Sequence, residues 1–73
     1  MDNTLKPYVK VKVFEDPKGE RGFEGVGILV HSCDVSVEKA EAHPGLERWG
    51  VAFPKGIQIV NRWVSPQHLL KEA

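Results

Sequence analysis

The sequence predicts an all-β fold, a small and strongly bent five-stranded barrel with a short helical turn near its C-terminal end. Apolar residues alternate with polar or small ones in several short runs, which is the periodicity of half-buried strands. Clusters of Gly, Pro and charged residues separate these runs, and no long amphipathic helix interrupts them. The 73 residues suffice for one small domain. Closing a sheet of this size into a barrel covers its apolar face and protects its edge strands.

The first strand is expected at residues 9–13, where Val and Lys alternate so that the valines share one face. Residues 1–7 precede this strand and are expected to be frayed. Residues 15–22 collect turn formers and charges, which predicts an exposed loop before the next strand.

The second strand is expected at residues 23–30. Its core face is predicted to carry the alternating β-branched residues Val26, Ile28 and Val30. Gly25 and Gly27 then occupy the opposite face. Glycines weaken a strand unless it bends sharply, so this is where the barrel is expected to bend.

Residues 34–47 predict an acidic loop that contains a short helical turn. Ser36 is followed by helix-forming residues, and His43-Pro44-Gly45 ends the pattern. The composition fits either one or two helical turns or a plain loop between strands.

Residues 49–53 and 56–64 predict two strands joined as a hairpin by a turn at residues 54–56. Trp49 shares one face with Val51 and Phe53, which places it in the core. A capping serine followed by Pro66 predicts a final helical turn. The complete expected core consists of Val11, Val13, Val26, Ile28, Val30, Val51, Phe53 and Leu69.

The formal net charge is zero, which argues against a nucleic-acid binder held by phosphate contacts. The charge is unevenly distributed, however, with −4 over residues 24–47 and +3 over residues 48–73. This asymmetry favours a charge-complementary protein partner. Because Cys33 is the single cysteine, an internal disulfide and a four-cysteine zinc or iron–sulfur site are excluded.

No apolar run has the length of a membrane-spanning helix, and the first residues do not resemble a signal peptide. The expected location is therefore the cytoplasm or a reducing compartment such as the plastid stroma. Cys33 lies near His31 and His43 in the sequence, but this spacing matches no zinc pattern. The sequence leaves the exposure and any redox role of Cys33 open. It contains no nucleophilic triad and no phosphate-binding loop, so no catalytic, cofactor-binding or metal-binding residue is predicted.

Four residues of the basic C-terminal region are the candidate partner-binding residues: Lys55, Arg62, Trp63 and His68. Trp63 fits either a packed core residue or an exposed interface residue beside an arginine. His68 fits either an exposed position on the final turn or a contact to a partner. Charge reversal at Lys55 and Arg62 is expected to weaken binding of an acidic partner in a salt-dependent way.

Together these elements resemble the variable (alpha) chain of ferredoxin–thioredoxin reductase and related small electron-transport accessory proteins with a Src-homology-3-like barrel. The residues that carry the resemblance are the alternating strand at 9–13, the Gly-Phe-Glu-Gly-Val-Gly run at 22–27, the Trp-Gly-Val-Ala-Phe run at 49–53, and the close of the chain at 63–69. The resemblance covers most of the chain in order, although the acidic segment 34–47 departs from the family pattern.

The resemblance implies a non-catalytic accessory subunit that stabilises and docks an iron–sulfur redox enzyme in electron transfer. The 4Fe–4S cluster is then expected on a catalytic partner subunit, with ferredoxin and thioredoxin as further partners and no cofactor on this chain. The family has no catalytic residues on this chain to transfer.

Two alternatives remain. The first is a free-standing barrel that binds a protein or, less in keeping with the charge, a nucleic acid. The second, more remote alternative is an oligomer similar to the plasmid-encoded dihydrofolate reductases, which the chain resembles at residues 41–45 and 58–59. In that family the two segments are nearly adjacent, and a tyrosine stands where this chain has Val60.

Overall fold

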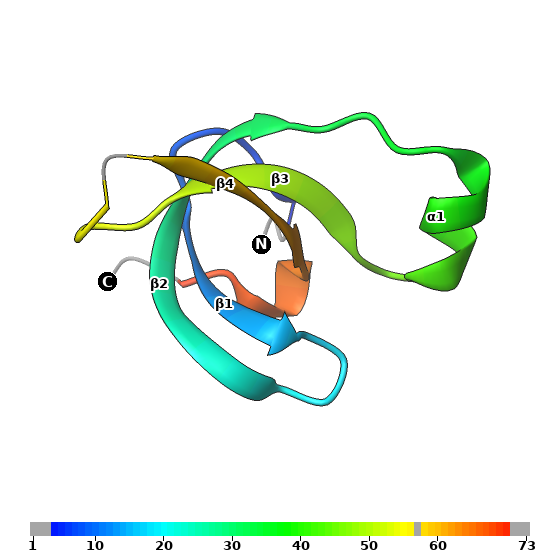
Figure 1. The fold of residues 1–73 in the computed structure, drawn as a ribbon, viewed down its shortest axis with the longest axis horizontal. Coiled ribbons are helices and arrows are strands. Elements are labelled where there is room, and N and C mark those ends of the chain that lie inside the picture. The colour runs from blue at the N-terminus through cyan, green and yellow to red at the C-terminus, as the bar shows by residue number, and fades with distance from the viewer. Residues whose placement is uncertain (1–3, 57, 71–73) are drawn as a thin grey trace.

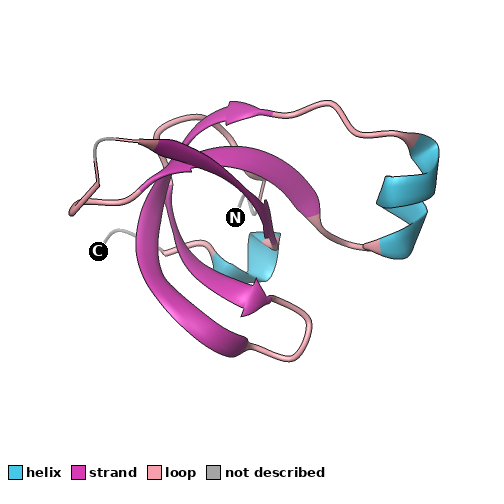
Figure 2. Ribbon diagram, viewed as in Figure 1, coloured by secondary structure: helices cyan, strands magenta, loops and turns pink. Residues whose placement is uncertain are grey.

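Four antiparallel strands, neighbours in the order of the sequence, form one bent sheet in the computed structural model, which describes residues 4–56 and 58–70 (Figure 1). The strands are β1 (Lys10–Asp16), β2 (Arg21–Ser32), β3 (Glu47–Ala52) and β4 (Ile59–Val64). Helix is confined to α1 (Val37–Ala42) and the 3-10 turn η1 (Pro66–His68) within the described residues (Figure 2). The predicted β-rich class is therefore confirmed.

The predicted closure into a five-stranded barrel is wrong for the part of the chain that the structure describes. After η1, Leu69 makes only an isolated antiparallel bridge with Val11. The amide of Leu70 donates to the carbonyl of Lys10 at 3.0 Å. Two residues cannot build a strand, so the sheet remains open between β4 and β1.

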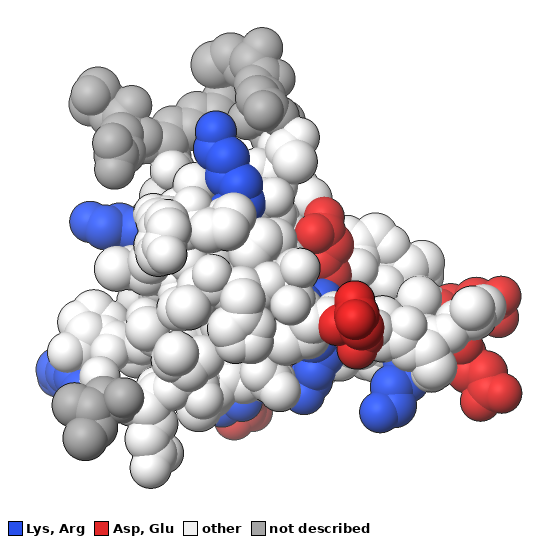
Figure 3. All heavy atoms as spheres, turned by 90° about the horizontal axis from the view of Figure 1, so that it is seen from above, with Lys and Arg blue, Asp and Glu red and all other residues white. Residues whose placement is uncertain are grey.

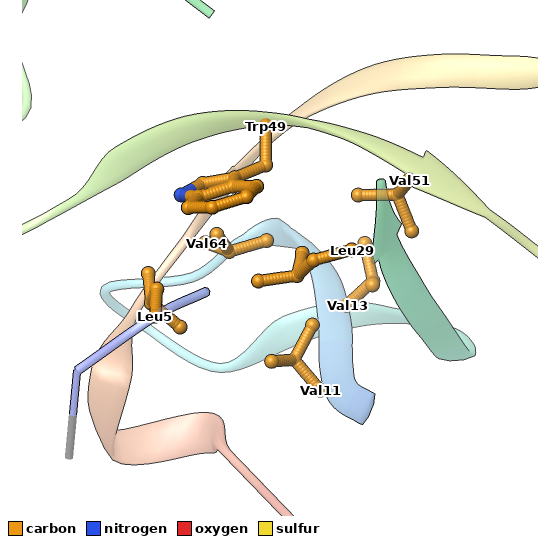
Figure 4. Packing of buried hydrophobic residues seen from close by; sticks show 7 residues of the cluster. All are labelled: Leu5, Val11, Val13, Leu29, Trp49, Val51 and Val64. Atoms are coloured by element: carbon orange, nitrogen blue, oxygen red, sulfur yellow. The ribbon is translucent and has the colours of Figure 1, made fainter. Parts of the chain in front are cut away.

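The core lies in the hollow of the bent sheet, where side chains from all four strands meet (Figure 4). Trp49 of β3 is buried there, as its alternation with Val51 predicted. The N-terminal segment also contributes, because Leu5 is buried in the same cluster. Residues 1–3 of the segment expected to fray lie outside the described residues. The cluster consists of Leu5, Val11, Val13, Leu29, Trp49, Val51 and Val64, with Val9, Phe53 and Leu69 packed against it.

The core face of β2 is the opposite of the predicted one. Val11 pairs with Gly27, and Leu29 pairs with Val51. Directly opposed residues of an antiparallel pair share a face, so the glycines and Leu29 point inward. The predicted core residues Val26, Ile28 and Val30 are only half-buried. Glycine is required at 27 because a Cβ there would overlap Cγ1 of Val51.

The predicted hairpin between β3 and β4 is present, and its turn is closed by a bond from the amide of Gly56 to the carbonyl of Phe53 at 3.0 Å. Ile57, which the sequence placed in the second strand of this hairpin, lies outside the described residues. The final helical turn is also confirmed: the Ser65 hydroxyl accepts from the amide of Gln67 at 3.3 Å, with Pro66 in the first helical position. No helix of the described residues is long and apolar enough to span a membrane.

Candidate functional site

The segment 33–46, here called the arm, leaves the sheet after β2 and returns to it at β3. Figure 1 shows α1 held to one side of the sheet at the end of this arm. Ser36 caps the helix, because its hydroxyl accepts from the amide of Lys39 at 3.3 Å. At the other end the amide of His43 donates to the carbonyl of Ala40 at 3.2 Å. No residue of α1 is buried, and Val37 is 73% exposed.

Trp63 of β4 fastens the arm to the sheet. It lies on the face away from the core, opposite Arg48 of β3. Its ring stacks on His43 with the centroids 4.0 Å apart and the planes inclined by 18°. The guanidinium carbon of Arg48 lies 5.5 Å from the centroid of the tryptophan ring, within the range of a cation–π contact. Trp63 is thus half-buried. The sequence had left open whether it is a packed core residue or an exposed interface residue, and its burial lies between the two.

A hollow of about 500 Å³ lies between the arm and this outer face of the sheet. Cys33 stands in it, half-buried, with its thiol 3.5 Å from Oδ1 of Asn61 and 3.9 Å from Nδ1 of His31. Among the described residues, no group of three or more His, Cys, Asp or Glu side chains is placed to hold a metal ion. The lining residues of the hollow are Cys33, Asp34, Val35, Ser36, Lys39, His43, Arg48, Asn61 and Trp63.

Arg62 is held by an ion pair across the open side of the sheet. Its Nε donates to both carboxylate oxygens of Glu24 on β2, at 3.1 and 3.2 Å, and its Nη2 lies 3.1 Å from one of them. Its Nη1 donates to the carbonyl of Asn61 at 2.9 Å. The side chains are 37% and 22% exposed. The guanidinium of Arg62 is therefore bonded within this chain.

His68 is 7% exposed, so it lies below the surface that it was predicted to form with a partner. Its ring packs on Phe14 at a centroid distance of 4.8 Å, and Phe14 in turn contacts the exposed Phe23 at 5.3 Å. Nε2 of His68 lies 3.7 Å from a carboxylate oxygen of Glu20, beyond hydrogen-bond distance. Neither ring nitrogen has a hydrogen-bond partner.

The four candidate residues do not form one surface. Arg62 and Trp63 line the same groove of about 310 Å³ at the open edge of the sheet. Lys55 is exposed in the turn between β3 and β4, whereas His68 is buried against Phe14 of β1 and does not line this groove. The groove is lined by Phe14, Glu15, Glu24, Arg48, Asn61, Arg62 and Trp63.

Sequence reasoning missed the pairing of Arg48 and the role of His43. The hairpin register contained a signal for Arg48, since a turn centred on Lys55 and Gly56 places residue 48 opposite residue 63. No comparable signal existed for His43, which the sequence showed as part of a helix stop and as a neighbour of Cys33 in a spacing that matches no zinc pattern. Its stacking on Trp63 joins residues 20 positions apart and depends on how the arm folds back.

No known protein family, curated protein or solved structure matches this chain.

Proposed function

We propose that this chain is a non-catalytic accessory subunit that binds a larger protein through its arm. The observation that carries the proposal is that α1 buries no residue of its own. Isolated helices shorter than about 12–15 residues are marginal in water, and most helices in proteins are stabilised by packing an apolar face. Helix α1 has six residues and presents Val37 to solvent. A partner that packs on Val37 supplies the contact that this helix otherwise lacks.

The charge of the arm supports a partner with a basic surface. Asp34, Glu38 and Glu41 are opposed only by Lys39 within the arm. Figure 3 shows acidic side chains gathered at the end of the molecule where α1 lies. Complementary charge of this kind raises the association rate and selects the partner. The proposed contact is an apolar patch around Val37 inside an acidic rim.

An iron–sulfur redox enzyme is the partner class that we propose from the resemblance to the ferredoxin–thioredoxin reductase variable chain. A single cysteine requires any such cluster to lie on the partner. The tagged chain is used to capture proteins from a native lysate, and the visible spectrum of the eluate is recorded. A brown eluate with iron–sulfur absorption supports this partner class. A colourless captured protein contradicts it and leaves the proposed contact through the arm standing.

Two variants of one residue test the arm itself. Val37→Asp places a charge in the proposed contact, whereas Val37→Thr preserves the shape of the side chain. We expect Val37→Asp to lose the captured protein, identified by mass spectrometry, and Val37→Thr to retain it. Because Val37 is exposed, both variants should unfold at the same urea concentration as the parent chain. Equal capture by both variants would contradict the arm as the contact.

The predicted basic docking surface gives a distinct result in the same experiment. Charge reversal at Lys55 or Arg62 weakens capture of an acidic partner, and the loss shrinks at high salt. The Arg62 variant also loses its bonds to Glu24, so Lys55→Glu is the cleaner of the two. Loss of capture in Lys55→Glu with full capture by Val37→Asp would move the contact from the arm to the β3–β4 turn.

A further inference from the structure

His68 of η1 is a polar side chain that is buried without a hydrogen bond. The side chain is only 6% exposed, and neither Nδ1 nor Nε2 has a partner. Buried polar atoms without a partner are uncommon in native proteins, because each one has lost its bonds to water without replacement. Imidazole is also the side chain whose charge ordinarily changes between about pH 5 and pH 8. The setting of His68 is therefore expected to change with its protonation.

Two charged side chains line the hollow of about 230 Å³ that His68 also lines. Glu20 comes from the turn between β1 and β2, and one of its carboxylate oxygens lies 3.7 Å from Nε2 of His68. Lys12 comes from β1 and is exposed. The aromatic neighbour of the imidazole ring is Phe14, which carries no charge. Within the described part of the chain, Glu20 is thus the one carboxylate of this hollow.

The segment that contains His68 leads from the end of β4 to β1. Directly after His68, Leu69 forms its isolated bridge with Val11 of β1. The next amide, that of Leu70, donates to the carbonyl of Lys10 at 3.0 Å. Because His68 immediately precedes both contacts, a bond that fixes His68 also strengthens the attachment of residues 69–70 to β1.

We propose that His68 and Glu20 form a pH-dependent latch that holds this C-terminal segment against β1 and the turn that follows it. When the imidazole takes up a proton, both ring nitrogens become donors and the ring becomes positive. A shift of the carboxylate by about 1 Å then brings it within the distance of a charge-assisted hydrogen bond. Glu20 is free to make this movement, because its side chain is 62% exposed. When the proton leaves, the charge that attracts Glu20 is lost.

The latch is closed at mildly acidic pH and opens as the pH rises. Glutamate ordinarily stays ionised down to about pH 5, whereas histidine has ordinarily lost its proton by about pH 8. The contribution of the ion pair is therefore present near the lower of these pH values and absent near the higher. Lys12 keeps its charge over the whole range, so it does not itself produce a pH dependence.

Hydrogen exchange of the Leu70 amide, measured at about pH 5.5 and about pH 8, tests the latch. The rate is expressed as protection relative to an unstructured chain at the same pH. We expect this amide to be about two- to fivefold better protected in the parent chain than in Glu20→Gln at the lower pH, as for a partly exposed ion pair. At the higher pH the two chains should be equally protected. Glu15→Gln is the matched control, because Glu15 is exposed and does not line the hollow, and it should follow the parent chain at both pH values.

A second measurement follows the carboxyl carbon of Glu20 by NMR from about pH 8 to about pH 5. Its signal should shift as the ring of His68 titrates, and His68→Phe, which keeps an aromatic ring against Phe14, should abolish that shift. A protection ratio that is the same at both pH values overturns the proposal, as does a Glu20 signal that titrates identically in His68→Phe. The latch is independent of the proposed contact through the arm, so Val37→Asp should behave like the parent chain in both measurements.

Discussion

Leu29 and Val37 are aliphatic residues eight positions apart, yet Leu29 is fully buried and Val37 is 73% exposed. Leu29 lies in the sheet, where strand pairing brings Val51 directly opposite it. Val37 lies in the arm, where no residue of the helix is buried. The sheet is explained by contacts within this chain, whereas the arm has a helix without a packing surface. This difference is the reason that the proposed partner contact is assigned to the arm and not to the sheet.

The largest difference in stability is expected when one aliphatic residue of the sheet and one of the arm are each replaced by alanine. Leu29→Ala should lower the free energy of unfolding by about 2–5 kcal/mol, because it leaves a cavity in the core. A domain of this size has a total stability of only about 0.05–0.15 kcal/mol per residue, so much of the protein should unfold. Val37→Ala should change stability by less than about 0.5 kcal/mol. Urea denaturation followed by tryptophan fluorescence measures both, and equal losses would remove the contrast.

The next largest effect on stability is expected at Gly27 of β2, which packs closely against Val51. Gly27→Ala places a methyl group against Val51 and should cost about 1–3 kcal/mol of overpacking. Gly56→Ala is the control, since the nearest atom to its added Cβ lies 3.9 Å away. The same urea titration compares the two variants. If Gly27→Ala left the free energy of unfolding unchanged, the core face of β2 would be the one that carries Val26 and Ile28 and not the one that carries the glycines.

The ion pair across the sheet opening contributes less. Glu24→Gln and Arg62→Gln, alone and together, form a double-mutant cycle with an expected coupling of up to about 1 kcal/mol for this partly exposed pair. The coupling should decrease as salt is added, because the exposed side of the pair is screened. Absence of coupling at low salt would show that Arg62 is free to act elsewhere, as the sequence prediction had it.

The smallest effect on global stability is expected in the arm. His43→Ala removes the stacking on Trp63 and should leave the urea midpoint within about 0.5 kcal/mol of the parent. The amide of Ala40 should nevertheless exchange faster with solvent, because the arm opens more easily. His31→Ala, on the exposed end of β2, is the control and should leave that amide unchanged. If the Ala40 amide exchanged faster in both variants, the stacking of His43 on Trp63 would not be the contact that holds the arm against the sheet.

Local patterns predicted much of the fold. Alternation located all four strands, and a capping serine with a proline located the turn η1. The face of β2 was misassigned because the glycines that line the core carry no side chain to mark that face. Strand pairing decides the question: Val11 opposite Gly27 turns the glycine inward.

The candidate site was harder to predict because its contacts are distant in sequence. Arg62 bonds to Glu24, which lies 38 positions earlier in the sequence, and neither residue type predicts this contact. His68 was expected near the surface, but the packing of Phe14 against its ring covers it. The role of Trp63 in partner binding stays a prediction, and its contact with His43 depends on the path of the arm.

Hydrogen exchange of the isolated chain compares the two regions most directly. The amide of Leu29 donates to Val9 and the amide of Ala40 donates to Ser36, each at 3.0 Å. Bond length therefore does not distinguish them, and the difference in packing does. We predict that the Leu29 amide exchanges only through global unfolding, while the Ala40 amide exchanges orders of magnitude faster through local opening of the arm. Equal protection of the two amides would show that the arm is stable without a partner and would contradict the account.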